Sequence, residues 1–250
     1  NARVPRGLFP DCREEKKRPQ GLAPRQQRLT RASLPEQGGF GEEFDDLKPM
    51  LYLPFEEENP GVTVHGKVYR VPGVMGGAMG FEDGFLTVEG VDLGGSYSML
   101  FWVKPDSTVG YESCVVAAAG ASCRSDDLAE GMSVEVADRY VRLRQKGPIG
   151  EMPVHLDMTC PADNREKWTH VAVTVDRENR RFGISVNMEP FSWWDIPENM
   201  DLTEGGRLYI GQDVLEHSGK RLRAALDDFC VCRKALADED LPRLKKYYCL

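Results

Sequence analysis

The amino-acid sequence predicts an all-β protein built as an antiparallel sandwich, and three stretches of the chain carry this prediction. Residues 167–176 read KWTHVAVTVD and place valine at every second position, which puts the valines on one face of a β-strand. Residues 98–105 and 226–232 alternate in the same way. Strands with one apolar face are typical of antiparallel sheets that pack on a core. We therefore expect six side chains to be buried together: Phe101, Val103, Val171, Val173, Phe229 and Val231.

The remaining elements follow in chain order. A short strand begins at Met50, and residues 62–71 alternate weakly. Residues 73–80 are rich in glycine, but they contain no G-K-[ST] motif and no helical pattern follows, so a sheet corner is favoured over a phosphate-binding loop. Asp83 and Gly84, between apolar segments, predict the turn of a β-hairpin.

The second half of the chain repeats the strand pattern. Pro105 ends one strand, residues 133–144 form a hairpin, and further strands are expected at 111–119, 152–158, 181–188 and 207–211. Strands spaced by roughly ten residues indicate a sandwich or a barrel. Residues 236–248 alone predict a helix, with Asp238 as its cap, Pro242 in its first turn, and Leu241 and Leu244 facing inward.

The N-terminal segment differs from this pattern. Residues 1–35 carry nine basic residues and three acids, a formal charge of +6, so the rest of the chain carries −14. The segment shows no sustained period and lacks the apolar content to fold alone. We expect a basic arm that lies either on its own acidic domain or on a partner protein. Nucleic acid is a poor candidate partner, because no aromatic residues alternate with the basic ones.

The longest apolar run and the start of the chain bear on where the protein is located. The longest apolar run, Cys114–Ala119, is far shorter than the roughly 20 residues that cross a bilayer. The chain starts at Asn1 without an apolar signal core, so we expect a fragment or the mature form of an imported or secreted protein, organellar or extracellular.

Seven cysteines leave at least one thiol unpaired. A Cys114–Cys123 bond across a hairpin stays open, whereas Cys230 and Cys232 share a strand face and are poorly placed to bond each other.

Six segments occur in a fixed order along residues 49–250: MLYLPFEE, GGAMGFEDGFLTVEG, YSMLFWVKPDS, KWTHVAVTVD, RLYIGQD and RAALDDFCVCRKALADEDL. This order resembles that of the laminin G-like, or concanavalin A-like lectin/glucanase, superfamily, in its pentraxin-like branch. The resemblance implies a two-sheet antiparallel jelly-roll sandwich over residues 49–250, with a short C-terminal helix. Residues 1–48, the extended arm, fall outside it.

The resemblance implies binding of glycans, proteins or sulfated chains, often with calcium, and in a minority of members glycoside hydrolysis. The hydrolases carry two carboxylates on one strand as Glu-x-Asp-x-Glu, and this sequence contains no such string. Glu135 and Asp138 lie three residues apart and are expected on opposite faces of a strand. We therefore expect no enzyme.

Asp227 and Asp228 match the family's acid pair on the terminal strand, which implies calcium ligands. The interpretation that we favour is an aspartate that holds a loop through backbone N–H groups, and we expect no required cofactor. Phe191, Trp193 and Trp194 are expected in a loop, where they either stack on a sugar or protein ligand or cap one end of the sandwich. The four histidines are scattered and suggest no catalytic arrangement.

Two functions follow from these observations. The first is a non-catalytic scaffold or accessory subunit of a larger protein assembly, in which the basic residues Arg13, Lys16, Lys17 and Arg18 of the arm contact a partner. The alternative is an extracellular or lumenal glycan-binding domain, with calcium as an optional ligand. The arm favours the first function, and the family resemblance favours the second.

Overall fold

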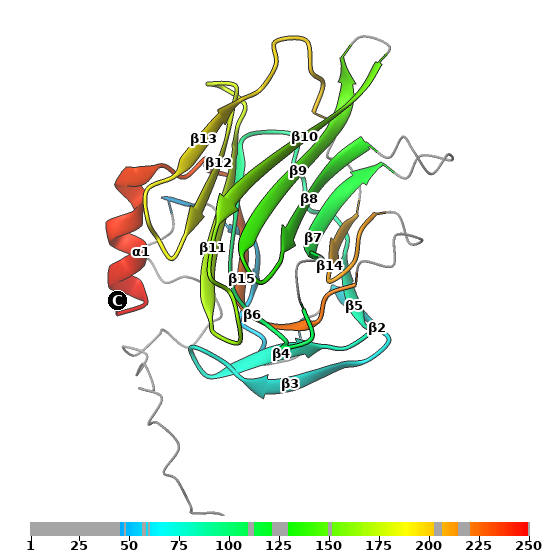
Figure 1. The fold of residues 1–250 in the computed structure, drawn as a ribbon, viewed down its shortest axis with the longest axis vertical. Coiled ribbons are helices and arrows are strands. Elements are labelled where there is room, and N and C mark those ends of the chain that lie inside the picture. The colour runs from blue at the N-terminus through cyan, green and yellow to red at the C-terminus, as the bar shows by residue number, and fades with distance from the viewer. Residues whose placement is uncertain are drawn as a thin grey trace, which may run out of the picture.

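The computed structural model describes residues 46–47, 49–56, 59, 61–109, 113–121, 130–149, 152–202, 207–214 and 221–249. These residues form two antiparallel sheets that face each other as a sandwich (Figure 1). Sheet A runs in the order β13 (Ser192–Asp195), β12 (Arg181–Val186), β11 (Thr169–Asp176), β6 (Tyr97–Pro105), β15 (Ala224–Cys232), β4 (Gly77–Phe81) and β3 (Val68–Pro72), and β1 (Pro49–Leu53) also pairs with β15. Sheet B runs in the order β10 (Met152–Pro161), β9 (Tyr140–Ile149), β8 (Glu130–Val136), β7 (Cys114–Ala121), β14 (Leu208–Ile210), β5 (Phe85–Val88) and β2 (Val62–His65).

The main core lies between the two sheets. Alternate residues of β6, β11 and β15 point into it, because successive side chains of a strand point to opposite faces. The six side chains predicted to be buried together are all fully buried in this one cluster: Phe101, Val103, Val171, Val173, Phe229 and Val231. The predicted two-sheet antiparallel fold is confirmed, and so is the hairpin of β8 and β9.

The outer face of sheet A carries a second apolar cluster, the outer cluster. Leu100 and Trp102 of β6 and Ala172 of β11 pack there against Leu241 and Leu244 of the C-terminal helix. The central strands are therefore buried on both faces, so all eight residues of β11 are buried. Cys230 and Cys232 lie together in this cluster as free thiols, as their shared strand face predicted.

The C-terminal helix consists of a single 3₁₀ turn, η2 (Asp238–Asp240), followed by α1 (Leu241–Tyr247). The predicted positions of Leu241, Leu244 and Pro242 are confirmed, but the predicted cap is wrong. Asp240 is the N-cap of α1, and its carboxylate accepts a hydrogen bond from the Ala237 amide at 3.1 Å. Asp238 instead accepts a hydrogen bond from the backbone amide of Phe191 at 2.7 Å, because the chain after β12 passes beside the helix start.

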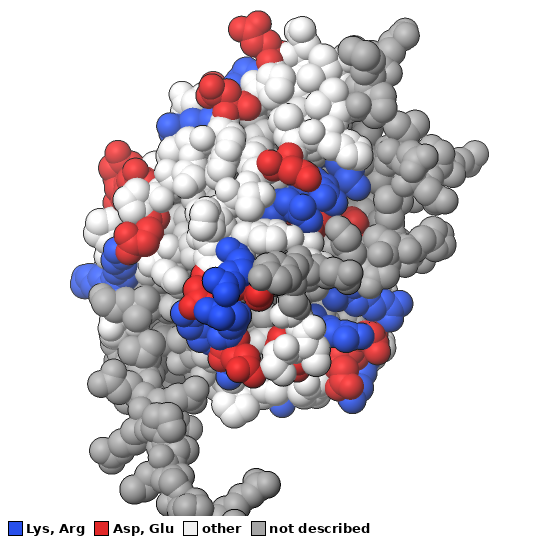
Figure 2. Space-filling view, viewed as in Figure 1, with Lys and Arg blue, Asp and Glu red and all other residues white. Residues whose placement is uncertain are grey.

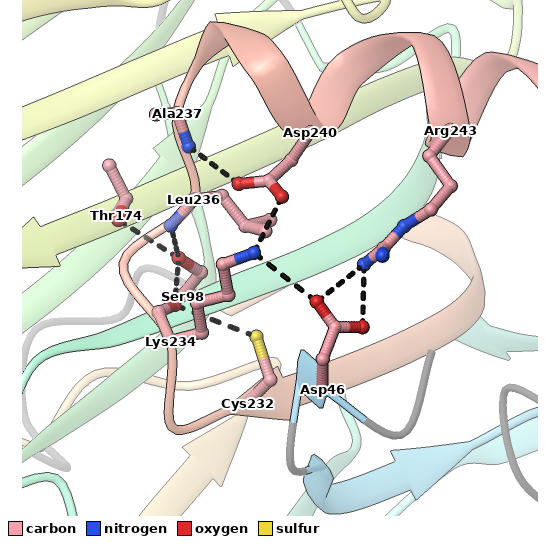
Figure 3. Close-up of polar contacts among 9 residues, drawn as sticks. All are labelled: Asp46, Ser98, Thr174, Cys232, Lys234, Leu236, Ala237, Asp240 and Arg243. Atoms are coloured by element: carbon pink, nitrogen blue, oxygen red, sulfur yellow. Dashed lines mark hydrogen bonds and ion pairs between the residues drawn. The ribbon is translucent and has the colours of Figure 1, made fainter. Parts of the chain in front are cut away.

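Charged side chains tie the helix to the start of the described chain. Asp46 accepts hydrogen bonds from Arg243 on α1 at 2.9 Å and from Lys234 at 3.4 Å, and Lys234 also donates to Asp240 at 2.7 Å (Figure 3). Beneath this network, the hydroxyl of Ser98 accepts from the Leu236 amide at 2.9 Å, which fixes the segment that leads into the helix.

The hairpin predicted at Asp83 and Gly84 is wrong. β4 pairs with β3 and β15 in sheet A, whereas β5 pairs with β2 and β14 in sheet B. The turn is therefore a corner at which the chain crosses from one sheet to the other. A side chain at position 84 would collide with the Lys67 carbonyl oxygen at 2.5 Å, so the corner requires glycine. Local turn chemistry cannot distinguish a corner from a hairpin.

Candidate functional site

Five residues form a row across the outer face of sheet A. Tyr69 on β3 lies opposite Gly80 on β4, and Gly80 lies opposite Ala225 on β15. Ala225 in turn lies opposite Lys104 on β6. Trp168 directly precedes Thr169, whose partner is Val103, so Trp168 lies opposite Lys104. The backbones of Tyr69 and Trp168 are four strand spacings apart, roughly 19 Å.

This row lines an open groove of about 330 Å³. Its floor is low because Gly80 and Ala225 carry little or no side chain. The ring of Tyr69 leans over the floor, since a Cβ atom added to Gly80 would lie only 2.8 Å from Cε2 of that ring. Tyr69 is 45% exposed and is one of two exposed large hydrophobic residues among the described ones. Trp168 is half-buried at the opposite end.

Two charged residues lie in the groove. Lys104 is half-buried as a residue, and its amine makes no ion pair or hydrogen bond with the residues that the structure describes. Asp106 lies in the turn after β6, and its carboxylate accepts a hydrogen bond from the Thr108 amide at 2.8 Å. That hydrogen bond lowers the pKa of Asp106, so the carboxylate is ionised at neutral pH. The groove thus combines two aromatic walls with one cation and one anion.

The three aromatic residues predicted in a loop, Phe191, Trp193 and Trp194, do not line the groove. Trp193 and Trp194 belong to β13, an edge strand of sheet A, and they project to opposite faces. Trp193 packs on the outer cluster with the Arg181 guanidinium 3.8 Å from its ring centroid, whereas Trp194 packs on the main core. Phe191 is buried beside Trp193. The two indoles therefore do not form one shared surface, and a binding role for these residues stays a prediction.

The acid pair of β15 has a clear structural arrangement. One oxygen of Asp227 accepts hydrogen bonds from the amides of Val74 at 2.7 Å and Met75 at 3.1 Å, and the other accepts from the Asp228 amide at 2.9 Å. Asp228 accepts a hydrogen bond from the Tyr52 hydroxyl at 2.7 Å. Asp227 therefore anchors the loop at Val74 and Met75 to β15. Among the described residues, no three His, Cys, Asp or Glu side chains gather closely enough to hold a metal ion.

Glu135 lies far from the groove, on the outer face of sheet B. It is completely buried, accepts a hydrogen bond from Ser113 at 2.5 Å, and forms ion pairs with Arg142 and Arg144. Burial opposes ionisation, but the bonds from Ser113 and Arg142 outweigh it and lower the pKa of Glu135. A carboxylate held in this way is a structural anion.

The histidines do not form a site either. His65 is hydrogen-bonded to Thr87 at 3.0 Å, and His170 is buried against the rings of Trp102 and Tyr248. Cys114 is a free, buried thiol, whereas Cys123 lies outside the described residues.

The predicted contact residues of the arm, Arg13, Lys16, Lys17 and Arg18, also lie outside the described residues. On the face of the described chain that Figure 2 shows, basic and acidic side chains lie in adjacent groups rather than in separate fields. Within the described residues, no helix has both the length and the apolar character that a bilayer crossing requires.

Sequence comparison agrees with this fold. The family model of the concanavalin A-like lectin/glucanases superfamily matches residues 81–241, well over half of the chain. This protein belongs to the concanavalin A-like lectin/glucanase superfamily. The match includes Lys104, Trp168 and Ala225 of the groove and the first residue of α1, whereas Tyr69 and Gly80 lie before it. A search of curated proteins finds no match to this sequence.

Solved structures with the same fold include receptor-binding domains. One receptor binding domain has a TM-score of 0.62 at 15% identity, with 83% of this chain and 53% of that chain covered. A structure of botulinum neurotoxin type C, whose cell entry depends on two ganglioside molecules, has a TM-score of 0.56 at 14% identity, with 75% and 46% covered. The binding domain of botulinum neurotoxin DC with rat synaptotagmin II has a TM-score of 0.55 at 16% identity, with the same coverage. This chain thus spans about half the length of these domains, and at such identities the likeness shows the fold alone.

Proposed function

We propose that this protein is a non-catalytic binding domain that holds carbohydrate in the groove between Tyr69 and Trp168. The observation that carries the proposal is the row of five residues, with an aromatic ring at each end and a floor of glycine and alanine between them. Sugar rings present apolar C–H faces together with hydroxyl groups. The aromatic walls can stack on the apolar faces of the sugar rings, and the charged side chains of Lys104 and Asp106 can form hydrogen bonds with the hydroxyl groups.

The volume of the groove also supports a ligand of this size. At about 330 Å³ it lies at the lower end of the usual range for small-molecule sites, roughly 300–1,000 Å³. The superfamily includes lectins, and one of the similar solved domains comes from a toxin whose cell entry depends on gangliosides. These comparisons support a glycan ligand over other small molecules.

The absence of catalysis is part of the proposal. Glycoside hydrolysis requires two carboxyl groups on either side of the scissile bond. Among the described residues that line the groove, Asp106 is the only acid, and Glu135 is buried in the other sheet. We expect no release of reducing ends from any β-glucan. Turnover that Glu135→Gln abolishes would contradict this part of the proposal.

A glycan array with three variants tests the binding site. Trp168→Ala and Tyr69→Ala should each weaken saccharide binding by about tenfold or more, because each removes a stacking face. Trp193→Ala is the matched control, since this half-buried tryptophan lies on the same sheet outside the groove. Thermal unfolding confirms that each variant is folded. No glycan signal at all, or a loss confined to Trp193→Ala, would reject the groove as the site.

The scaffold function depends mainly on the arm, which lies outside the described residues. It stays a prediction.

A further inference from the structure

Tyr69 and Gly80 form a cross-strand pair in which the tyrosine ring lies over the glycine. The two residues are direct partners on β3 and β4. A Cβ atom added to Gly80 would lie 2.8 Å from Cε2, 2.9 Å from Cζ and 3.2 Å from Cδ2 of the Tyr69 ring. These distances are shorter than ordinary van der Waals contacts. The ring therefore occupies the space that a side chain at position 80 would fill.

The backbone of Gly80 gives no other reason for a glycine. Gly80 lies within β4 and is not among the described glycines that have a positive φ. Glycine inside a strand is unfavourable, because it loses more conformational freedom on folding than alanine does. Position 80 thus uses the missing side chain rather than the flexible backbone. Glycine in a strand often marks a close approach, and the atoms that come closest to this one belong to Tyr69.

The position of the ring matters because Tyr69 is one wall of the groove. β3 is an edge strand, so a tyrosine on it could extend into solvent, away from the sheet. The ring instead leans one strand spacing inward, which brings it to roughly 14 Å, or three strand spacings, from the backbone of Trp168. Tyr69 is 45% exposed, so the ring face that does not rest on Gly80 is open to a ligand.

We propose that Gly80 is the positioning residue of the groove, which holds the ring of Tyr69 over the floor as a platform for a sugar ring. The inference rests on the proposed carbohydrate-binding function and adds a residue that acts through Tyr69. A ring that is in place before a ligand arrives loses little side-chain freedom on binding, and such preorganisation increases affinity.

A second pair of the same kind provides a matched control. Trp193 on β13 is the direct partner of Gly183 on β12, and a Cβ atom added to Gly183 would lie 2.9 Å from the indole. That position is enclosed, since the same Cβ atom would also lie 2.7 Å from Thr174 and 2.9 Å from Phe191. The Arg181 guanidinium lies over the indole ring. This pair lies outside the groove and belongs to the packing of sheet A.

Alanine at the two positions should have opposite effects. In Gly80→Ala only the outer end of the Tyr69 side chain has to move, so the melting temperature should stay the same or rise, because alanine restricts the unfolded chain. The signal on the glycan array should nevertheless fall by about tenfold or more, since the platform is displaced. Gly183→Ala should lower the melting temperature and leave the array signal unchanged, because its side chain has no space among buried neighbours.

Nuclear magnetic resonance of the full chain measures the ring position without any ligand. The α-protons of Gly80 lie beside an aromatic ring, so the ring current should shift their resonances. Tyr69→Leu should move these resonances toward the values usual for a glycine in a strand. Tyr69→Phe keeps the ring, so it should retain both the shift and most of the array signal.

The outcomes separate the inference from the function on which it rests. Gly80 resonances that do not respond to Tyr69→Leu, or a Gly80→Ala protein that keeps its full array signal, would reject the inference while carbohydrate binding stands. Loss of stability and array signal together in Gly80→Ala would reject it too, because the glycine would then be structural. If the unaltered protein gives no array signal, the proposed function fails, and the resonances still decide whether Gly80 positions Tyr69.

Discussion

At the scale of single residues, Asp227 connects segments that are far apart in the sequence. Its carboxylate binds the amides of Val74 and Met75 and also the amide of Asp228, which has a positive φ of 48°. The pairing of β15 with β6 shifts register between Asp227 and Cys230, so the two acids mark a β-bulge. The sequence pattern Asp-Asp therefore encodes a bulge and a loop anchor together.

Replacing Asp227 tests loop anchoring against calcium binding. Asp227→Ala should lower the free energy of unfolding by about 2–4 kcal/mol, because buried amides lose their acceptor. Denaturant unfolding should give the same loss in EDTA and in millimolar calcium. Stabilisation of the unaltered protein by calcium, absent in the variant, would show that the acid pair is a metal site.

His170 makes stability depend on pH. Burial lowers the pKa of His170 from 6.5 to about 3, and neither ring nitrogen has a hydrogen-bond partner among the described residues. Between these two pKa values the unfolded chain binds a proton that the folded chain does not, so stability falls as the pH is lowered.

Asp227 changes the stability in the opposite direction. Burial and the charge of Asp228 raise the pKa of Asp227 to about 7, so its contribution to stability falls as the pH rises from about 4 to 7.

A variant isolates the histidine from these opposing effects. His170→Leu removes the titrating group and keeps the site apolar. Its stability relative to the unaltered protein should increase by on the order of 1 kcal/mol per pH unit as the pH falls from about 6.5 to 4. Urea unfolding at several pH values measures the difference. A difference that does not change with pH would mean that His170 is already solvated when the chain is folded.

At the scale of elements, the C-terminal helix gives sheet A its second buried face. Leu244 is 1% exposed and packs in the outer cluster with Trp102 and Tyr248. Because the helix lies over strands from several parts of the chain, we expect it to unfold together with the sandwich rather than to fray separately.

Truncating the helix contact tests this coupling. Leu244→Ala should lower the free energy of unfolding by about 2–4 kcal/mol, since it leaves a cavity between helix and sheet. Lys246→Ala, on the exposed side of the same helix, should change it by less than about 0.5 kcal/mol. Denaturation followed by both tryptophan fluorescence and circular dichroism gives the values. Equal effects of the two substitutions would contradict the helix's role in the folded core.

At the scale of the whole molecule, the uneven charge predicts a partner for the arm. Residues 1–35 carry +6 and the remainder −14. Ion pairs at a surface contribute about 0–1 kcal/mol each and weaken with salt, but several together can hold a tether. Leu8, Phe9, Leu22 and Leu29 would add apolar contacts.

Deleting residues 1–40 tests this prediction. The melting temperature should change little, while partner proteins that co-purify with the full chain at native ionic strength should be lost. A truncated protein that unfolds would instead give the arm a structural role within its own chain and would remove the main support for a scaffold function.

The strands and the main core could be predicted because their signal is local. Alternation of valine and other apolar residues within a strand decides which side chains point the same way, whatever the strand's partners are. For this reason the burial of Val171, Val173 and Phe229 followed from short segments alone. The positions of Leu241 and Leu244 followed likewise from the spacing within one helix.

The groove could not be predicted, because its five residues come from five different segments between positions 69 and 225. Tyr69, Gly80, Ala225, Lys104 and Trp168 become neighbours only through the strand order and register of sheet A. The same holds for the Asp83–Gly84 corner, where the choice between hairpin and crossover depends on which distant strand each neighbour pairs with. Local pattern determines the direction of a side chain, but pairing across the sheet determines its neighbours, and a binding site is made of neighbours.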